Sequence, residues 1–177
     1  MKLIKIFACI LLFCAITVSA AAAAIEDESA APLFGEFMTF DIYGEPITYE
    51  IFADAKLTLV NLWGTYCPPC IHEMPFLGEL SREYAEKDVA IVGIVIDVGD
   101  TASLELAKRI VSDTNADFTH LLIADAMTGA LNDVLYIPTT FFVDSQGRQV
   151  GEMIIGGHDK DEWAALIEEY LALLISE

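Results

Sequence analysis

Basic residues are scarce in this sequence, and their scarcity narrows the range of partners. Only 9 lysines and arginines stand against 28 aspartates and glutamates, so the formal net charge is −19. A protein that binds nucleic acid neutralises phosphates with clustered lysine and arginine, and the sequence has no such cluster. We therefore expect no nucleic-acid partner, and we interpret the excess of acid as a well-solvated surface.

Cysteine and histidine are also few, which argues against most metal and haem sites. The 4 cysteines and 3 histidines include one close pair, Cys67 and Cys70. A structural zinc site needs about four ligands, usually as two pairs, and the histidines here are scattered without ligand spacing. Haem attachment requires histidine directly after the second cysteine, whereas Ile71 stands there and His72 comes one place late. We expect neither a metal nor a cofactor, and we expect His72 on the surface of a helix.

The N-terminus has the pattern of an export signal. Lys2 and Lys5 provide a positive start, residues 6–18 are apolar, and residues 19–24 are small. Residues 6–25 are also long enough to form an uncleaved membrane anchor. Alanine is only weakly apolar, however, and cleavage sites of the A-x-A kind are dense, so we favour cleavage.

This pattern divides the chain into three parts. We predict a signal peptide at residues 1–24, a linker at 25–33 and one domain at 34–177. The mature protein would act in the periplasm or at the outer face of the cytoplasmic membrane. After cleavage only Cys67 and Cys70 remain, in a compartment where disulfides persist.

The apolar periodicity predicts one α/β domain. Short continuous or alternating apolar runs indicate strands, and apolar residues three and four apart indicate helices. Turn residues join the first two expected strands and the last two as hairpins. Helices packed on a central sheet are typical of such an order. The expected strands are residues 37–42, 47–51, 57–63, 89–95, 118–123, 139–143 and 149–155, and the expected helices are 74–87, 102–112, 126–135 and 163–174.

The cysteine pair stands where the strand at 57–63 gives way to a helix. Pro68 and Pro69 suit the first helical turn, where a missing N–H costs little. Cys67 then lies at the helix N-terminus, which favours a thiolate, and Cys70 lies one turn inside. A purely structural disulfide is a poor alternative, because a loop of two residues barely restricts the unfolded chain. The spacing therefore favours redox chemistry.

Three stretches carry a family resemblance: W-G-T-Y-C-P-P-C, Pro75 five residues after the second cysteine, and I-P-T-T-F-F-V-D-S-Q-G-R. Together they resemble thioredoxin-fold proteins, and in particular the TlpA/ResA type of extracytoplasmic thiol–disulfide oxidoreductase, which includes reductants of cytochrome c maturation. The resemblance runs from about Pro32 to the C-terminus. It implies a three-layer α/β/α thioredoxin fold with an N-terminal hairpin at 37–51 and a central insertion at 97–135.

The resemblance also implies roles for single residues. Pro138 falls on the family's cis-proline, and Glu73 falls on its active-site acid. Typical thioredoxins carry a buried aspartate where Asn61 stands, so Glu73 is the remaining acid to take the proton of Cys70. We expect the pKa of Glu73 to rise toward neutrality in a semi-apolar pocket. Tyr66 replaces the tryptophan that is usual before the first cysteine, which affects the docking surface rather than the chemistry.

These observations predict an exported enzyme that reduces protein disulfides. Cys67 would attack the substrate and Cys70 would resolve the mixed disulfide. We predict that Trp63, Tyr66 and Ile137 contact the substrate, although Trp63 also fits an ordinary core position. The expected partners are a disulfide-containing substrate protein and a membrane thiol carrier of the CcdA/DsbD type that recharges the cysteines.

Two other functions are compatible with a related fold. A peroxiredoxin-like peroxidase favours a P-x-x-x-T-x-x-C loop, and here Val60 and Gly64 stand in place of its proline and threonine. A copper-delivery module would need a further histidine or methionine ligand beside the cysteine pair, which the sequence does not locate.

Overall fold

A computed structural model describes residues 31–175 of the chain. The predicted signal at 1–24 and most of the predicted linker lie outside this range. Leu33, the last residue of that linker, is hydrogen-bonded to the domain: its N–H donates to the carbonyl of Gly147 at 2.8 Å. Within residues 31–175 no helix is long and apolar enough to cross a membrane.

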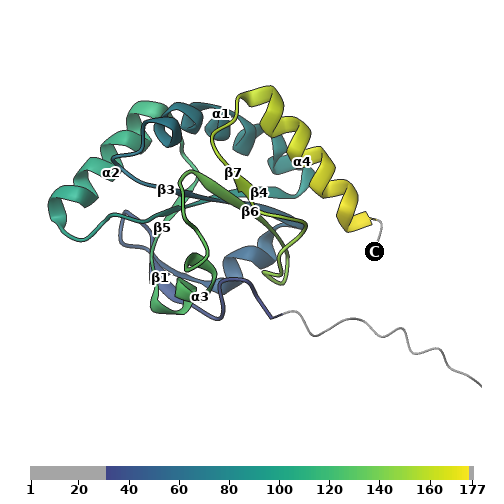
Figure 1. Ribbon diagram of the computed structural model, residues 1–177, viewed down its shortest axis with the longest axis horizontal. Coiled ribbons are helices and arrows are strands. Elements are labelled where there is room, and N and C mark those ends of the chain that lie inside the picture. Colours follow the sequence, from purple (N-terminus) through teal and green to yellow (C-terminus); the bar gives the residue numbers. More distant parts are fainter. Residues whose placement is uncertain (1–30, 176–177) are drawn as a thin grey trace, which may run out of the picture.

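The centre of the molecule is a five-stranded mixed sheet (Figure 1). Its strand order is β5-β4-β3-β6-β7, with β3, β4 and β5 parallel, β6 antiparallel to β3, and β7 antiparallel to β6. All seven residues of β3 are buried, as expected for a continuous apolar run in a central strand covered on both faces. The strands are β3 (Leu57–Trp63), β4 (Val89–Val95), β5 (Thr119–Leu122), β6 (Thr139–Asp144) and β7 (Ile154–Ile155).

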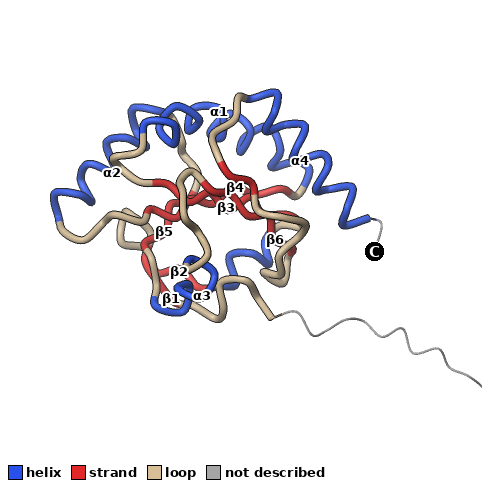
Figure 2. The backbone as a smooth tube through the Cα atoms, viewed as in Figure 1, coloured by secondary structure: helices blue, strands red, loops and turns tan. Residues whose placement is uncertain are grey.

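The sheet separates two outer layers (Figures 1 and 2). The long helices α1 (Pro68–Tyr84), α2 (Thr101–Thr114) and α4 (Lys160–Ile175) cover one face, and a short 3-10 turn, η2 (Ala85–Lys87), extends α1. The three-layer thioredoxin fold is therefore confirmed, but its second layer consists of short elements. These are the hairpin β1 (Met38–Phe40) with β2 (Pro46–Thr48), η1 (Tyr49–Asp54), η3 (Asp125–Met127) and α3 (Thr128–Leu131).

Alternation along β3 assigns its side chains to the two layers. Leu57 and Leu59 pack with α1 and α4, whereas Val60 and Leu62 pack with the hairpin layer. Because side chains alternate along a strand, the odd-numbered Asn61 shares the face that α1 covers. The sheet register then places four residues side by side in one row across this face: Thr140, Asn61, Gly93 and His120.

Five expected elements are shorter in the structure than predicted: the strands at 37–42 and 118–123 lose residues only at their ends, and three others differ more. The second strand of the hairpin ends at Thr48 and becomes η1, which turns Phe52 into contact with the rings of Phe34 and Phe37. The strand expected at 149–155 is reduced to β7, because Gly151 has a left-handed φ of 64° that interrupts extended backbone.

The third difference is the helix expected at 126–135. Only a short 3-10 turn and the single turn of α3 form there. Met127 is buried against the hairpin layer, and Leu131 and Val134 pack partly against the same cluster. Leu135 and Tyr136 are exposed instead of completing a helix. Here tertiary packing outweighs local helix propensity.

Candidate active site

The two cysteines meet at the start of α1, where the sequence predicted them. Cys67 is the N-cap residue, Pro68 and Pro69 occupy the first turn, and Cys67 and Cys70 form a disulfide bond. The N–H of Cys70 donates to the Cys67 sulfur at 3.3 Å. In the reduced protein this N–H and the helix dipole both favour the thiolate of Cys67.

Burial distinguishes the two cysteines. Cys70 is 0% exposed, and Cys67 is 5% exposed, so only Cys67 reaches the surface, and it does so less openly than we expected. The Cys67 sulfur lies 3.7 Å from the main-chain oxygen of Ile137. The peptide bond between Ile137 and Pro138 is cis, which is the isomer that the resemblance implied. The β6 end of the sheet thus lies directly beside the surface-facing sulfur.

The loop between β3 and α1 is held in place by Asp97, which the sequence analysis did not single out. Its carboxylate accepts hydrogen bonds from the N–H of Thr65 at 3.0 Å and from the hydroxyl of the same residue. Gly64, in the same loop, leaves room for the side chains of Ile137 and Tyr66, since a Cβ there would lie 3.1 Å from Ile137 and 3.2 Å from the ring of Tyr66. A signal was available, because Asp97 follows β4 at the edge where parallel strands end together.

The prediction that Trp63 contacts the substrate is wrong. Trp63 is 0% exposed and packs in the cluster that contains Cys67, Cys70 and Met74. Its place at the end of β3 directs the indole under α1 instead of toward solvent. Tyr66, three residues later, is 67% exposed and remains available to a substrate. Trp63 therefore packs in the core against the cysteines, which is the ordinary core position that the sequence also allowed.

A buried histidine completes the surroundings of Trp63. The indole N–H donates to Nδ1 of His120 at 3.1 Å, and Nε2–H of His120 donates to the carbonyl of Ala116 at 2.9 Å. Burial lowers the pKa of His120 to about 4, so the ring stays neutral at physiological pH. Gly93 makes room for it, because a Cβ there would lie 2.3 Å from Nδ1. The sequence analysis assigned no role to His120.

Glu73 is fully buried one turn beyond Cys70. One carboxylate oxygen, Oε1, accepts a hydrogen bond from Nδ2 of Asn61 at 2.9 Å. The other, Oε2, accepts from the N–H of His158 and from Nε1–H of Trp163, both at 3.2 Å. Desolvation outweighs these three hydrogen bonds and raises the pKa of Glu73 to about 7. The direction of this shift is the one expected from the sequence.

The segment before α4 closes over Glu73, and the sequence analysis missed it. It brings Gly157 and His158, and the first turn of α4 brings Trp163, to a carboxylate that lies 84 to 90 residues earlier in the chain. A Cβ on Gly157 would lie 3.3 Å from the carbonyl of Pro69 and 3.4 Å from Oε2 of Glu73. The glycine therefore permits this segment to pack directly against the start of α1.

An apolar groove of about 430 Å³ is lined by Tyr66, which precedes Cys67 in the chain, and by Ile137, whose main-chain oxygen lies 3.7 Å from the Cys67 sulfur. Ile123, Leu135 and Tyr136 also line it. Several of these side chains are exposed, with Leu135 at 81% and Tyr136 at 69%. The predicted substrate residues Tyr66 and Ile137 are thus brought together, whereas Trp63 lies beneath them.

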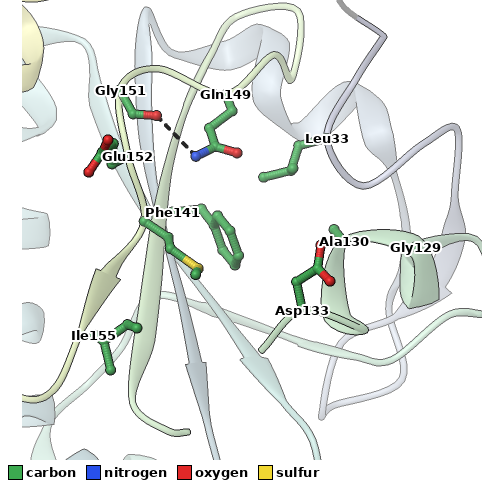
Figure 3. A pocket seen from close by; sticks show the side chains of 10 residues that line it. Leu33, Gly129, Ala130, Asp133, Phe141, Gln149, Gly151, Glu152 and Ile155 are labelled. Carbon is green, nitrogen blue, oxygen red and sulfur yellow. Dashed lines mark hydrogen bonds between the residues drawn. The ribbon is translucent and has the colours of Figure 1, made fainter. Parts of the chain in front are cut away.

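A larger cavity of about 720 Å³ is lined by neither cysteine, and Figure 3 shows the residues around it. It opens between α3, the β6 to β7 connection and Leu33, and the amide of Gln149 donates to the carbonyl of Gly151 across its rim. None of the predicted site residues lines it. In residues 31–175 no group of three or more His, Cys, Asp or Glu is placed to hold a metal ion.

Comparison with known proteins identifies the family. The model of the family described as Redoxin matches residues 27–165. The chain belongs to the Redoxin family. It is 32% identical to the thiol-disulfide oxidoreductase ResA of Bacillus thuringiensis subsp. konkukian (strain 97-27) over 135 residues, which make up 76% of this chain and 72% of that protein. This member of the Redoxin family is therefore of the ResA type, as its motifs suggested, and is an oxidoreductase.

Solved structures share the fold of this Redoxin member. A thiol:disulfide interchange protein of the thioredoxin family from Chlorobium tepidum TLS matches with a TM-score of 0.67 at 22% identity, over 80% of this chain and 95% of that chain. A secreted disulfide oxidoreductase of Mycobacterium tuberculosis matches with a TM-score of 0.62 at 23% identity, over 76% and 96% of the two chains. At such identities these structures support the thioredoxin fold alone.

Proposed function

We propose that this protein reduces disulfide bonds of other proteins outside the cytoplasm, using the dithiol of Cys67 and Cys70. The observation that carries the proposal is the position of their disulfide. It caps the N-terminus of α1, with the sulfur of Cys67 3.7 Å from the main-chain oxygen of Ile137. An extended substrate strand beside Ile137 would present its own disulfide to Cys67, with main-chain groups available for pairing.

The proposed reaction has two exchange steps. The Cys67 thiolate attacks one sulfur of the substrate disulfide, which breaks that bond, forms a mixed disulfide and releases the first substrate thiolate. The Cys70 thiolate then attacks the Cys67 sulfur, which releases the second substrate thiolate. The substrate gains two electrons and two protons, and the enzyme ends with the disulfide seen in the structure.

Glu73 has the environment of the group that activates Cys70. A thiol that is 0% exposed resists ionisation, because burial disfavours the thiolate. Glu73 follows Cys70 by three residues on the same helix, and its pKa of about 7 suits a base that works near neutral pH. In this proposal Glu73 takes the Cys70 proton before the second exchange step.

The groove beside the disulfide favours an apolar substrate segment. Tyr66, Leu135 and Tyr136 are exposed aromatic or aliphatic side chains, and exposed apolar surface of this kind marks interaction sites. The oxidised C-x-x-C-H segment of an apocytochrome c is the substrate suggested by the family resemblance.

Export and recharging complete the proposal. The positive start, apolar stretch and small residues at 1–24 support export with cleavage of a signal peptide. Outside the cytoplasm the oxidised enzyme would need a thiol donor, and a membrane thiol carrier of the CcdA/DsbD type would supply the two electrons.

The test is to mix the reduced mature domain with a peptide that contains an oxidised C-x-x-C-H segment and to follow peptide thiols by mass spectrometry. A matched peptide with the same cysteines and a scrambled sequence measures specificity, and a Cys67→Ser variant measures background. We expect a reduction potential nearer to about −270 mV than to about −120 mV. A potential near the upper value, with the enzyme oxidising the peptide, would reverse the proposed direction.

A further inference from the structure

His158 lies between the buried carboxyl of Glu73 and solvent. Its main-chain N–H donates to Oε2 of Glu73 at 3.2 Å. Its imidazole packs edge-on against the indole of Trp163, with ring centroids 4.9 Å apart and an interplanar angle of 74°. Trp163 in turn donates its own N–H to Oε2 of Glu73. Both the main chain and the ring of His158 are therefore fixed relative to the same carboxylate oxygen.

The two ring nitrogens of His158 have different surroundings. Nδ1 lies 3.4 Å from Oε2 of Glu162, whose side chain is 59% exposed. Nε2 is buried and has no hydrogen-bond partner among residues 31–175. A neutral imidazole carries one proton, and the carboxylate of Glu162 favours it on Nδ1, so Nε2 is left as a buried acceptor. A buried acceptor without a partner costs free energy, and such groups often mark a functional role.

Glu73 requires an outlet for its proton. The carboxyl is fully buried, and its described partners are the side-chain N–H groups of Asn61 and Trp163 and the main-chain N–H of His158. An amide, an indole and a peptide N–H all donate, and none of them accepts a proton near neutral pH. A proton taken from Cys70 must therefore pass to another group before Glu73 can work again.

We propose that His158 exchanges the proton of Glu73 with solvent. This inference rests on the proposed role of Glu73 as proton acceptor. The proton leaves the Glu73 carboxyl and reaches Nε2 through one bridging water, because no hydrogen bond joins Nε2 to the carboxyl in the described contacts. The proton on Nδ1 then leaves to Glu162 or to bulk water. No electrons move, and tautomer exchange with solvent restores the ring.

The charges around His158 suit this path. Glu73 of α1 lies on its inner side, and Glu162 of α4 faces Nδ1. Asp159, the next residue in the chain, caps the start of α4: its carboxylate accepts a hydrogen bond from the N–H of Glu162 at 2.9 Å. The nearest lysine in the chain, Lys160, is held in ion pairs with two glutamates of α1, Glu79 and Glu83. His158 affects the exchange reaction only through the protonation of Glu73, and in this sense it is a positioning residue rather than a catalytic one.

Coupled titration tests the inference without any turnover. In the oxidised protein, Glu73 is titrated by NMR in the wild type and in His158→Gln. We expect His158→Gln to raise the titration midpoint of Glu73, because the variant removes a ring that can hold a proton beside the carboxylate. His72→Gln is the matched control, since His72 is an exposed histidine on α1 that contacts only the ring of Phe76 among described aromatic neighbours. It should leave Glu73 unchanged.

A kinetic readout separates proton exchange from packing. The reduced protein is mixed with the chromogenic disulfide DTNB at low buffer concentration, where the second thiolate released reports the attack of Cys70. His158→Gln should slow this release about tenfold, and added imidazole should restore it. Slow release without rescue, or unchanged titration of Glu73, would overturn the role of His158 while leaving the redox function intact. A wild-type protein that fails to reduce DTNB would instead overturn the redox function, and the role of His158 with it.

Discussion

Replacing Glu73 by glutamine should change how the stability of the oxidised protein depends on pH. The carboxyl of Glu73 has an ordinary pKa of 4.5, and burial raises its folded-state pKa to about 7. Between these values the unfolded chain has lost the proton and the folded chain still holds it. The contribution of Glu73 to the free energy of unfolding is therefore greatest below about pH 4.5 and is lost as the pH rises through 7. A pKa difference of about 2.5 corresponds to about 3 kcal/mol.

Glutamine should fit the site that the protonated acid occupies. Its carbonyl can accept the two N–H groups of His158 and Trp163 that now reach Oε2. Its amide would then face Asn61, whose own amide must rotate to present oxygen. The hydroxyl of Thr140, 3.0 Å from Asn61 Nδ2, tolerates this rotation because a hydroxyl both donates and accepts. At low pH the variant and the wild type should therefore be nearly equally stable.

His120 has the opposite effect on the wild-type curve. Burial lowers its pKa from 6.5 to about 4, so its contribution is complete above pH 6.5 and is lost as the pH falls toward 4. The slopes from Glu73 and His120 oppose each other between pH 4.5 and 6.5. The difference between Glu73→Gln and the wild type cancels the effect of His120 and of groups common to both proteins, which leaves the titration of Glu73.

The assay is guanidinium unfolding of the oxidised proteins, followed by tryptophan fluorescence across this pH range. Glu73→Gln should gain up to about 3 kcal/mol over the wild type between pH 4.5 and pH 8. Glu86→Gln, at an exposed glutamate just after α1, is the control and should show no such gain. A difference that stays constant from pH 4.5 to pH 8 would refute the raised pKa of Glu73.

Three further predictions concern the surroundings of the disulfide. In the reduced protein, alkylation near neutral pH should label Cys67 much faster than Cys70, because Cys67 is at the helix N-terminus and reaches the surface. Gly93→Ala should destabilise the protein by about 1–3 kcal/mol in denaturant unfolding, because a Cβ there would lie 2.3 Å from a buried imidazole nitrogen. Trp163→Phe removes a hydrogen bond to the Glu73 carboxylate, so NMR titration should show the pKa of Glu73 rising above about 7.

For each of these three predictions, a specific result would contradict the reasoning. Faster labelling of Cys70 would exchange the roles of the two cysteines. Gly99→Ala is the control for Gly93→Ala, since nothing lies within 4 Å of a Cβ at Gly99, and equal losses in both variants would show that the space beside His120 is not the cause. A lower pKa of Glu73 in Trp163→Phe would mean that the indole does not stabilise the carboxylate.

Local pattern determined much of the chemistry. The spacing of Cys67 and Cys70, with two prolines after a buried strand, was enough to place a reactive pair at a helix start, because caps and first turns are governed by neighbouring residues. The place of Glu73 one turn later followed from helical geometry. The central strands could be predicted for the same reason, since continuous apolar runs need burial on both faces.

Tertiary structure decided the environment of those residues. Trp163 and His158 reach Glu73 across separations of 90 and 85 residues, and no local pattern encodes such contacts. Burial, and with it the raised pKa of Glu73 and the lowered pKa of His120, depends on which segments close over each group. The same packing placed Trp63 in the core while Tyr66 stayed exposed. The sequence determined which groups could react, and desolvation by distant segments determined how they ionise.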